Sequence, residues 1–179
     1  MNRRQFLALG GTAGAVIVTA PILSRAQGAG APQVTPLTVA AALAQLDRLQ
    51  QAEVQKAGSW NLFQVYTHLA QSVEYSMSGY PQPKSWLFQN TLGSLAFAVF
   101  AGKGSMNHSL DEAIPGAPPL AVEGDPALAL QRLRQSLLAF RDYAGELQPH
   151  FAYGELSKDE YEQAHVMHLN NHLEEFVLG

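Results

Sequence analysis

Apolar residues recur at steps of three and four over most of the chain beyond residue 36, which is the period of an amphipathic helix. The pattern predicts helices at about 37–54, 59–78, 86–101, 125–147 and 157–177. No segment alternates polar and apolar side chains with the two-residue period of a half-buried strand. The sequence therefore predicts an all-α protein.

Residues that favour helix ends stand at the predicted boundaries. Ser59 is suited to cap the second helix, and Asp125 precedes a proline in the first turn of the fourth. Ser157 and Glu160 have the spacing of a capping box at the start of the last helix. The third helix is apolar nearly all round, so we expect it to be buried on most sides.

The segment 102–124 contains three prolines and four glycines, which exclude regular structure. It predicts a long crossover loop, and loops of this length in compact domains are commonly functional or mobile. Five helical segments with one long connection fit a bundle of four long helices with one additional helix.

The N-terminus has the pattern of an export signal. Arg3 and Arg4 precede a hydrophobic pair, an apolar stretch follows, and 24–26 offers small residues for cleavage after Ala26. We therefore predict a twin-arginine signal peptide over 1–26, a flexible spacer over 27–36 and a mature domain over 37–179. The partner during export would be the twin-arginine translocase and the destination the periplasm. An uncleaved anchor is the alternative, but about 16 apolar residues are short for a bilayer that needs about 20.

Composition narrows the chemistry. Lys and Arg number 11 against 15 Asp and Glu, for a net charge of −4, which argues against nucleic acid as a partner. There are no cysteines, so disulfides and thiolate ligands are excluded. Any metal ion must be held by nitrogen and oxygen ligands, and after cleavage no stable membrane span is expected.

Three of the six histidines lie within eight residues of the last predicted helix: His165, His168 and His172. His168 and His172 are four residues apart, about 6 Å along one helical face, so both rings can reach one metal ion. His165 is seven residues from His172 and should not share that ion. A third nitrogen can come from His68, which lies beside the apolar stripe of the second helix. The three would suit Zn²⁺ or Ni²⁺, although histidines near an apolar stripe are more often hydrogen-bonded core residues.

Further polar residues have two interpretations each, a role at this site or ordinary packing and solvation. We predict that Glu74 and Glu174 face solvent. Glu175 could hydrogen-bond to a metal-binding histidine or face water. Asn171 and Tyr66 flank the candidate ligands. The remaining histidines, His108, His150 and His165, are less favoured as ligands than the three above.

Several sequence segments resemble the DinB-like (DinB/YfiT) superfamily, in the branch labelled domain of unknown function 1569. They are residues 60–76 around His68, the segments 114–118 and 149–154, and residues 168–173 of the last helix. The resemblance implies a DinB-like four-helix bundle with a long crossover loop. It also implies a divalent metal ion held by His68, His168 and His172. Relatives include transferases and isomerases that use low-molecular-weight thiols, but no residue here identifies a thiol site.

The sequence leaves two functions open. One is an exported metal-dependent hydrolase or transferase, and the alternative is a non-catalytic metal-binding or structural helical bundle. A pocket beside the three histidines, roofed by 102–124 and holding a further polar group such as His150 or Glu175, would favour the enzyme. A homodimer is compatible with a bundle of this kind.

Overall fold

The computed structural model describes residues 36–56 and 58–178. The predicted signal peptide, 1–26, and the predicted spacer up to residue 35 lie outside the described residues. The described chain is mostly helical and contains one small sheet, in agreement with the all-α prediction. Its elements are, in order, α1 (Val39–Gln51), β1 (Val54–Lys56), α2 (Leu62–Ser78), α3 (Trp86–Phe88), the π-helix η1 (Gln89–Gly93), α4 (Ser94–Lys103), α5 (Pro126–Asp142), α6 (Lys158–Leu173) and β2 (Phe176–Leu178).

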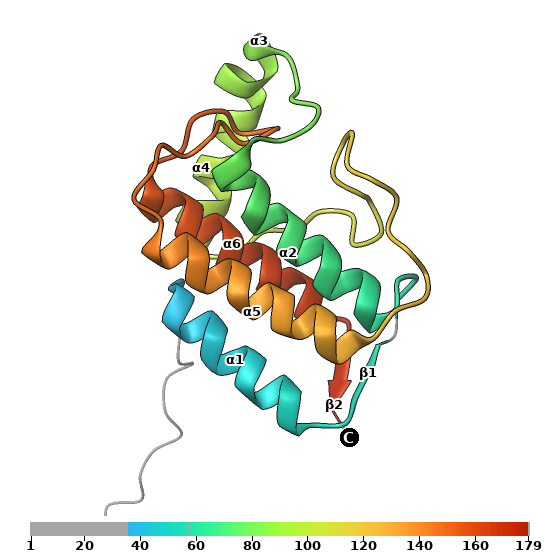
Figure 1. Cartoon of the computed structure of the whole chain (residues 1–179). Helices are drawn as coiled ribbons and strands as arrows, with labels where there is room; N and C mark the ends of the chain where they lie inside the picture. The colour runs from blue at the N-terminus through green and yellow to red at the C-terminus, as the bar shows by residue number, and fades with distance from the viewer. Residues whose placement is uncertain (1–35, 57, 179) are drawn as a thin grey trace, which may run out of the picture. The chain divides into compact units, whose positions relative to one another are not determined.

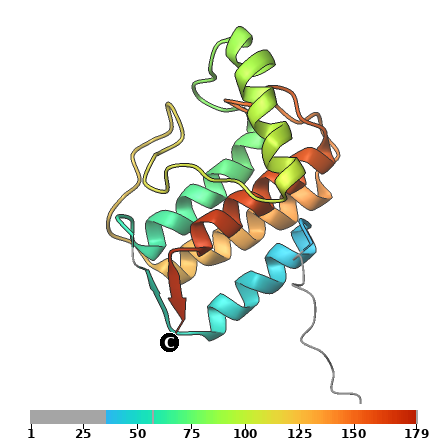
Figure 2. The same ribbon diagram turned by 180° about the vertical axis from the view of Figure 1, so that it is seen from behind.

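The hydrophobic core lies among α1, α2, α5 and α6, which run side by side in Figures 1 and 2. The apolar stripes predicted from the sequence meet there, and each helix contributes side chains that are almost completely buried. Examples are Leu46, Val65, Leu133, Phe140 and Val166. Burying a side chain of this kind contributes roughly 1.5–3 kcal/mol, so this core fixes how α2 and α6 lie relative to each other.

Side-chain caps fix where these helices begin. Thr38 caps α1 and Asp125 caps α5, and Ser157 with Glu160 forms the predicted capping box of α6. At α2 the prediction of Ser59 is wrong, because the helix begins after Asn61, whose side chain accepts from the Gln64 backbone N–H at 3.0 Å. The Gln64 side chain in turn accepts a hydrogen bond from the Asn61 backbone N–H, so α2 also begins with a capping box.

The apolar periodicity predicted no strand and extended the first and last helices too far. In the structure α1 ends at Gln51 and α6 at Leu173, and β1 pairs with β2 as antiparallel strands. Each strand is three residues long, too short to show a two-residue period. The strands exist because packing of the helices brings two distant segments of the chain side by side.

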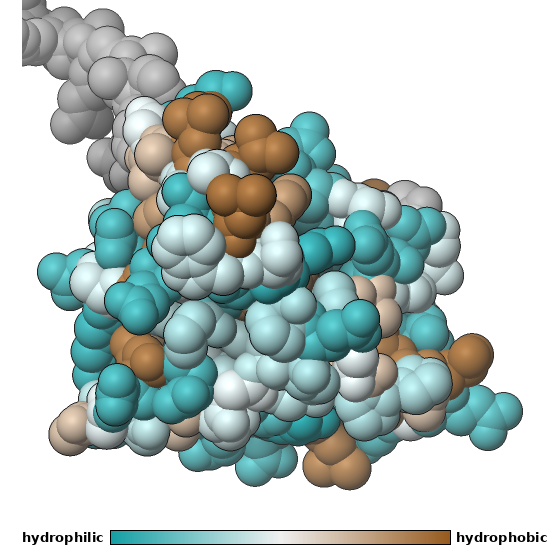
Figure 3. All heavy atoms as spheres, turned by 90° about the horizontal axis from the view of Figure 1, so that it is seen from above, coloured by the Kyte–Doolittle hydropathy of each residue, from teal (hydrophilic) through white to brown (hydrophobic). Residues whose placement is uncertain are grey.

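The expectation that the third predicted helix is buried on most sides is wrong. Along α3, η1 and α4 the buried residues are Gln89, Gly93 and Phe97. Large apolar side chains face solvent: Trp86 is 74% exposed, Leu87 65%, Leu92 64% and Leu95 62%. These helices extend past the shared core (Figure 1). Their outward faces therefore have no other helix of the described chain to pack against and stay exposed, although they are apolar. Figure 3, seen from the α3 end, shows hydrophobic side chains gathered there.

The long loop predicted after the third helix is present, with no helix or strand between Lys103 and Pro126. Gly104 closes α4 in the left-handed conformation (φ 69°). Met106 and Ile114 are buried and attach the loop to the helices. Within the described residues, no helix combines the length and the apolar character needed to cross a bilayer.

Candidate metal centre

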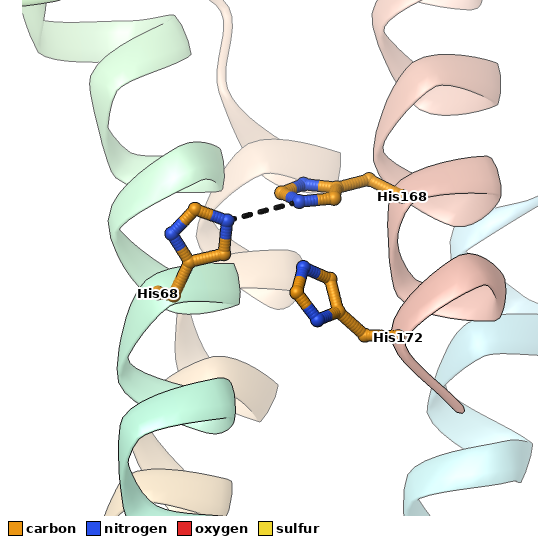
Figure 4. Close-up of side chains that lie close together, drawn as sticks. All are labelled: His68, His168 and His172. Atoms are coloured by element: carbon orange, nitrogen blue, oxygen red, sulfur yellow. Dashed lines mark hydrogen bonds between the residues drawn. The ribbon is translucent and has the colours of Figure 1, made fainter. Parts of the chain in front are cut away.

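Three histidines from two helices meet on one side of the core. His68 lies near the middle of α2, and His168 and His172 follow each other by one turn on α6 (Figure 4). Their candidate ligand nitrogens are all within 4.8 Å of one another. His68 and His172 are buried and His168 is partly exposed. The structure thus brings together the three side chains that the sequence selected.

The geometry of these rings suits a shared ion. His68 Nε2 and His168 Nε2 are 3.1 Å apart, at hydrogen-bonding distance. Two nitrogens bound to one tetrahedral Zn²⁺ at 2.0–2.1 Å lie about 3.3 Å apart. The ring centroids of the three histidines are 5.0 to 5.1 Å apart in every pair. The donor set therefore fits one divalent ion after small rotations of the rings.

Burial keeps His68 and His168 neutral. Loss of hydration, together with the nearby His108, lowers the pKa of His68 to about 3. The pKa of His168 lies well below its usual value because of burial and the neighbouring His68 and His172. A neutral imidazole is the form that binds a metal ion. At neutral pH the rings of His68 and His168 are therefore in the form that binds a metal ion.

An indole covers one side of the cluster. The Trp60 ring stacks on His172 at 6.3 Å with 5° between the planes, and it contacts the His68 ring at 5.0 Å. Trp60 immediately precedes Asn61, the cap of α2, so the start of the helix fixes its position. Helical periodicity predicted no role for Trp60, because this residue lies just outside the helix in which the period located His68.

The long loop covers another side. The His108 ring lies 4.8 Å from that of His168 and 5.4 Å from that of His172. The backbone N–H of His108 donates to Asn171 Oδ1 at 3.2 Å. Sequence spacing gave His108 little weight, because helical periodicity says nothing about where a loop residue lies. Asn171, a candidate for a role at the site, therefore holds this loop in place through that hydrogen bond.

A cavity of about 300 Å³ opens beside the cluster. Its wall includes His68, His168 and His108, and the loop contributes Met106 and Glu112 to Pro115. Residues 150–153, the connection between α5 and α6, form another part of the wall, and Lys84 also lines it. The loop that the sequence proposed as a roof does border this cavity, and His150 is part of its lining.

His150 and His165 line the cavity but are held by other contacts. His150 Nδ1 accepts from the backbone N–H groups of Ala152 and Tyr153, both at 3.2 Å, and the ring stacks on Tyr153 at 4.3 Å. His165 Nε2 is 3.2 Å from Ser76 Oγ, and its ring meets the edge of Phe140. Burial lowers the pKa of each to about 3. Both are therefore neutral residues of the interior.

Two other candidates lie elsewhere. Tyr66 is buried in the main core with its ring edge on Phe176, and it does not line the cavity. Glu74 pairs with Arg132 at 2.6 Å and accepts from the Ser136 hydroxyl. The carboxylate belongs to the partly exposed contact between α2 and α5, as its helical position relative to His68 suggested. Glu175 is not among the residues that line the cavity.

A comparison with protein families finds a match over residues 33–178 to the family described as "Protein of unknown function (DUF1569)". No curated protein and no solved structure matches the chain. The match covers the whole described part of the chain.

Proposed function

This chain belongs to the DUF1569 family, and we propose that it is a metal-dependent enzyme whose single divalent ion is held by His68, His168 and His172. The reaction would be a hydrolysis or a group transfer. Zn²⁺ and Ni²⁺ are the ions that best suit three imidazole nitrogens. We further propose that the core of α1, α2, α5 and α6 is a DinB-like four-helix bundle.

The observation that carries this proposal is the cavity beside the three histidines. A bound divalent ion would supply a Lewis acid that polarises an oxygen of the substrate. Because His150 Nδ1 accepts two backbone hydrogen bonds, the neutral ring carries its hydrogen on Nε2, which can donate. Lys84 and Glu112 place opposite charges along the same wall and can orient a polar substrate.

One observation favours the alternative of a non-catalytic ion. Trp60 covers His68 and His172 closely, and His172 is completely buried. An ion enclosed on that side would tie α6 to α2 and serve the fold. The two functions differ in whether the ion is reached from the cavity, so they differ in whether a small molecule can bind to it.

For the location, we propose export by the twin-arginine route, with cleavage after Ala26 and a periplasmic destination. The support is the pattern of Arg3, Arg4 and the apolar stretch that follows. N-terminal sequencing of the protein recovered from the periplasm tests this. Recovery of the intact chain from the cytoplasm alone would contradict it.

Elemental analysis tests the metal site. The full chain should carry about one equivalent of a divalent ion, and His68→Ala, His168→Ala and His172→Ala should each lose most of it, because each variant removes one of the three imidazoles that converge on the ion. His165→Ala is the matched control, a buried histidine on the same helix that should leave the metal content unchanged. Circular dichroism verifies that each variant is helical. Metal retained by folded His168→Ala or His172→Ala would rule out this site.

Inhibitor binding separates the two functions. Azide or imidazole should perturb the visible spectrum of the Co²⁺-loaded protein if the ion faces the cavity. A spectrum that is unchanged at saturating inhibitor would support the enclosed, non-catalytic ion.

A further inference from the structure

We propose that His108 is a fourth nitrogen ligand of the metal centre, supplied by the long loop through Nε2. The inference rests on the proposed metal site and extends it beyond the two helices. With four histidines bound, the proposed catalysis requires an ion that accepts a fifth ligand from the cavity. It concerns the loop residue to which helical periodicity gave no weight.

The hydrogen bond at the far side of the ring fixes which nitrogen is available. His108 Nδ1 is 2.6 Å from the backbone carbonyl oxygen of Ser109. A carbonyl oxygen can only accept, so Nδ1 carries the hydrogen, and in the neutral ring Nε2 is left with its lone pair. Histidines that bind metal ions commonly donate their other ring N–H to a carbonyl in this manner.

The available nitrogen is withdrawn from solvent and has no protein partner. His108 Nε2 is buried and makes no hydrogen bond with any described residue. A buried polar atom in that state costs about 1–3 kcal/mol, and such atoms are rare in folded proteins. Coordination of an ion by Nε2 would remove this cost.

The ring lies beside two of the three proposed ligands. Its centroid is 4.8 Å from His168 and 5.4 Å from His172, close to the 5.0 Å between those two rings. The ring also lines the same cavity as His68 and His168. Trp60 occupies the other side of His68 and His172, so His108 is the histidine that faces the cluster from the loop.

The loop is fastened on both sides of His108. The backbone N–H is held by Asn171 on α6, one residue before His172. Met106, two residues earlier, is buried against Phe97 and Met167. Ser109 donates from its hydroxyl to Asp111 at 2.7 Å. These contacts hold His108 in position before any ion binds, which lowers the entropy cost of using it as a ligand.

The test is a Co²⁺ titration of the full chain, followed by the visible absorption of the bound ion. His108→Ala should still bind Co²⁺ through the three remaining histidines, but at least about tenfold more weakly and with altered absorption bands. Free imidazole added to His108→Ala should restore the original spectrum, because the deleted side chain leaves room for it. Asn107→Ala, an exposed neighbour in the same loop, is the control and should behave as the parent.

The outcomes separate this inference from the proposed function. If the parent and His108→Ala bind Co²⁺ with equal affinity and equal spectra, His108 is not a ligand and the inference is overturned, while the three-histidine site stands. Weaker binding that imidazole does not restore, with an unchanged spectrum, would also overturn it, because that result indicates a purely structural role. A parent that binds no metal at all would overturn the proposed function itself.

Discussion

Histidines of this chain differ in what their ring nitrogens contact. Nitrogens of His150 and His165 are occupied by backbone amides and by Ser76, whereas His68 and His168 turn their Nε2 atoms toward each other. Buried polar atoms with protein partners belong to the fold. Convergent imidazoles with few other partners are what a metal ion requires.

The buried histidines outside the ligand set predict acid sensitivity. His150 and His165 have a pKa of about 3 in the folded protein and about 6.5 when exposed. Above pH 6.5 both states are neutral and nothing is gained or lost. As the pH falls from 6.5 toward 3, these histidines bind protons in the unfolded chain but not in the folded chain. The free energy of unfolding therefore drops by about 1.4 kcal/mol per pH unit for each histidine.

Urea unfolding between pH 7.5 and 5 in the presence of a chelator measures this. The variant His165→Gln keeps a side-chain amide near Ser76 but removes the titrating group, so its pH slope should be shallower by about 1.4 kcal/mol per pH unit. An identical slope in parent and variant would contradict this prediction, because it would show that His165 binds protons equally in the folded and unfolded states.

Single residues show how much of the candidate site could be predicted from the sequence. His168 and His172 follow from four-residue spacing on one helix, and His68 from its place beside an apolar stripe, since a helix fixes which residues share a face. Trp60 and His108 lie outside helices, and their positions depend on how the loops fold onto α2 and α6. No local period encodes that packing.

Among the elements, the caps were the most predictable features. Asp125 with Pro126 and Ser157 with Glu160 act locally, and the structure confirms them. The exposure of α3, η1 and α4 was not predictable, because an apolar helix is compatible with burial and with a face that extends beyond the core. The β1 and β2 pair was missed for a similar reason, since it depends on contact between distant segments.

The contact between η1 and the α5–α6 connection gives a prediction at this scale. Gly93 is buried, and a Cβ there would overlap the carbonyl oxygen of Ala152. Gly93→Ala should therefore lower the free energy of unfolding by about 1–3 kcal/mol, as overpacking does. Urea unfolding followed by circular dichroism measures the change.

Gly102, in α4, is the matched control because a Cβ there meets no atom within 4 Å. Gly102→Ala should raise stability by about 0.5–1 kcal/mol, because alanine favours a helix over glycine. A Gly93→Ala variant as stable as Gly102→Ala would mean that η1 does not pack closely on Ala152.

For the whole molecule, the exposed apolar face is where we predict the contact of a homodimer, an assembly that the sequence left open. Phe88, Leu92, Leu95 and Val99 follow steps of four, three and four, so they share one face, and all are exposed. Exposed apolar patches of this kind commonly mark contact surfaces. We predict that Leu92→Glu combined with Leu95→Glu converts a dimer to a monomer in sedimentation velocity. Leu128→Glu, an equally exposed leucine on α5, should leave the dimer intact, and a monomeric parent would contradict this prediction.

The positions of His68 and His168 along the chain have one more consequence. They are 100 residues apart in a sequence without cysteine, so an ion bound by both acts as a cross-link. Because the site exists only when α2 and α6 are packed together, the free energy of ion binding would add to the stability of the folded chain. The cross-link cannot form until α6 has been synthesised and has packed on α2. During synthesis the helices up to α5 would therefore assemble without it, and uptake of the proposed ion would be a late event in the maturation of the protein.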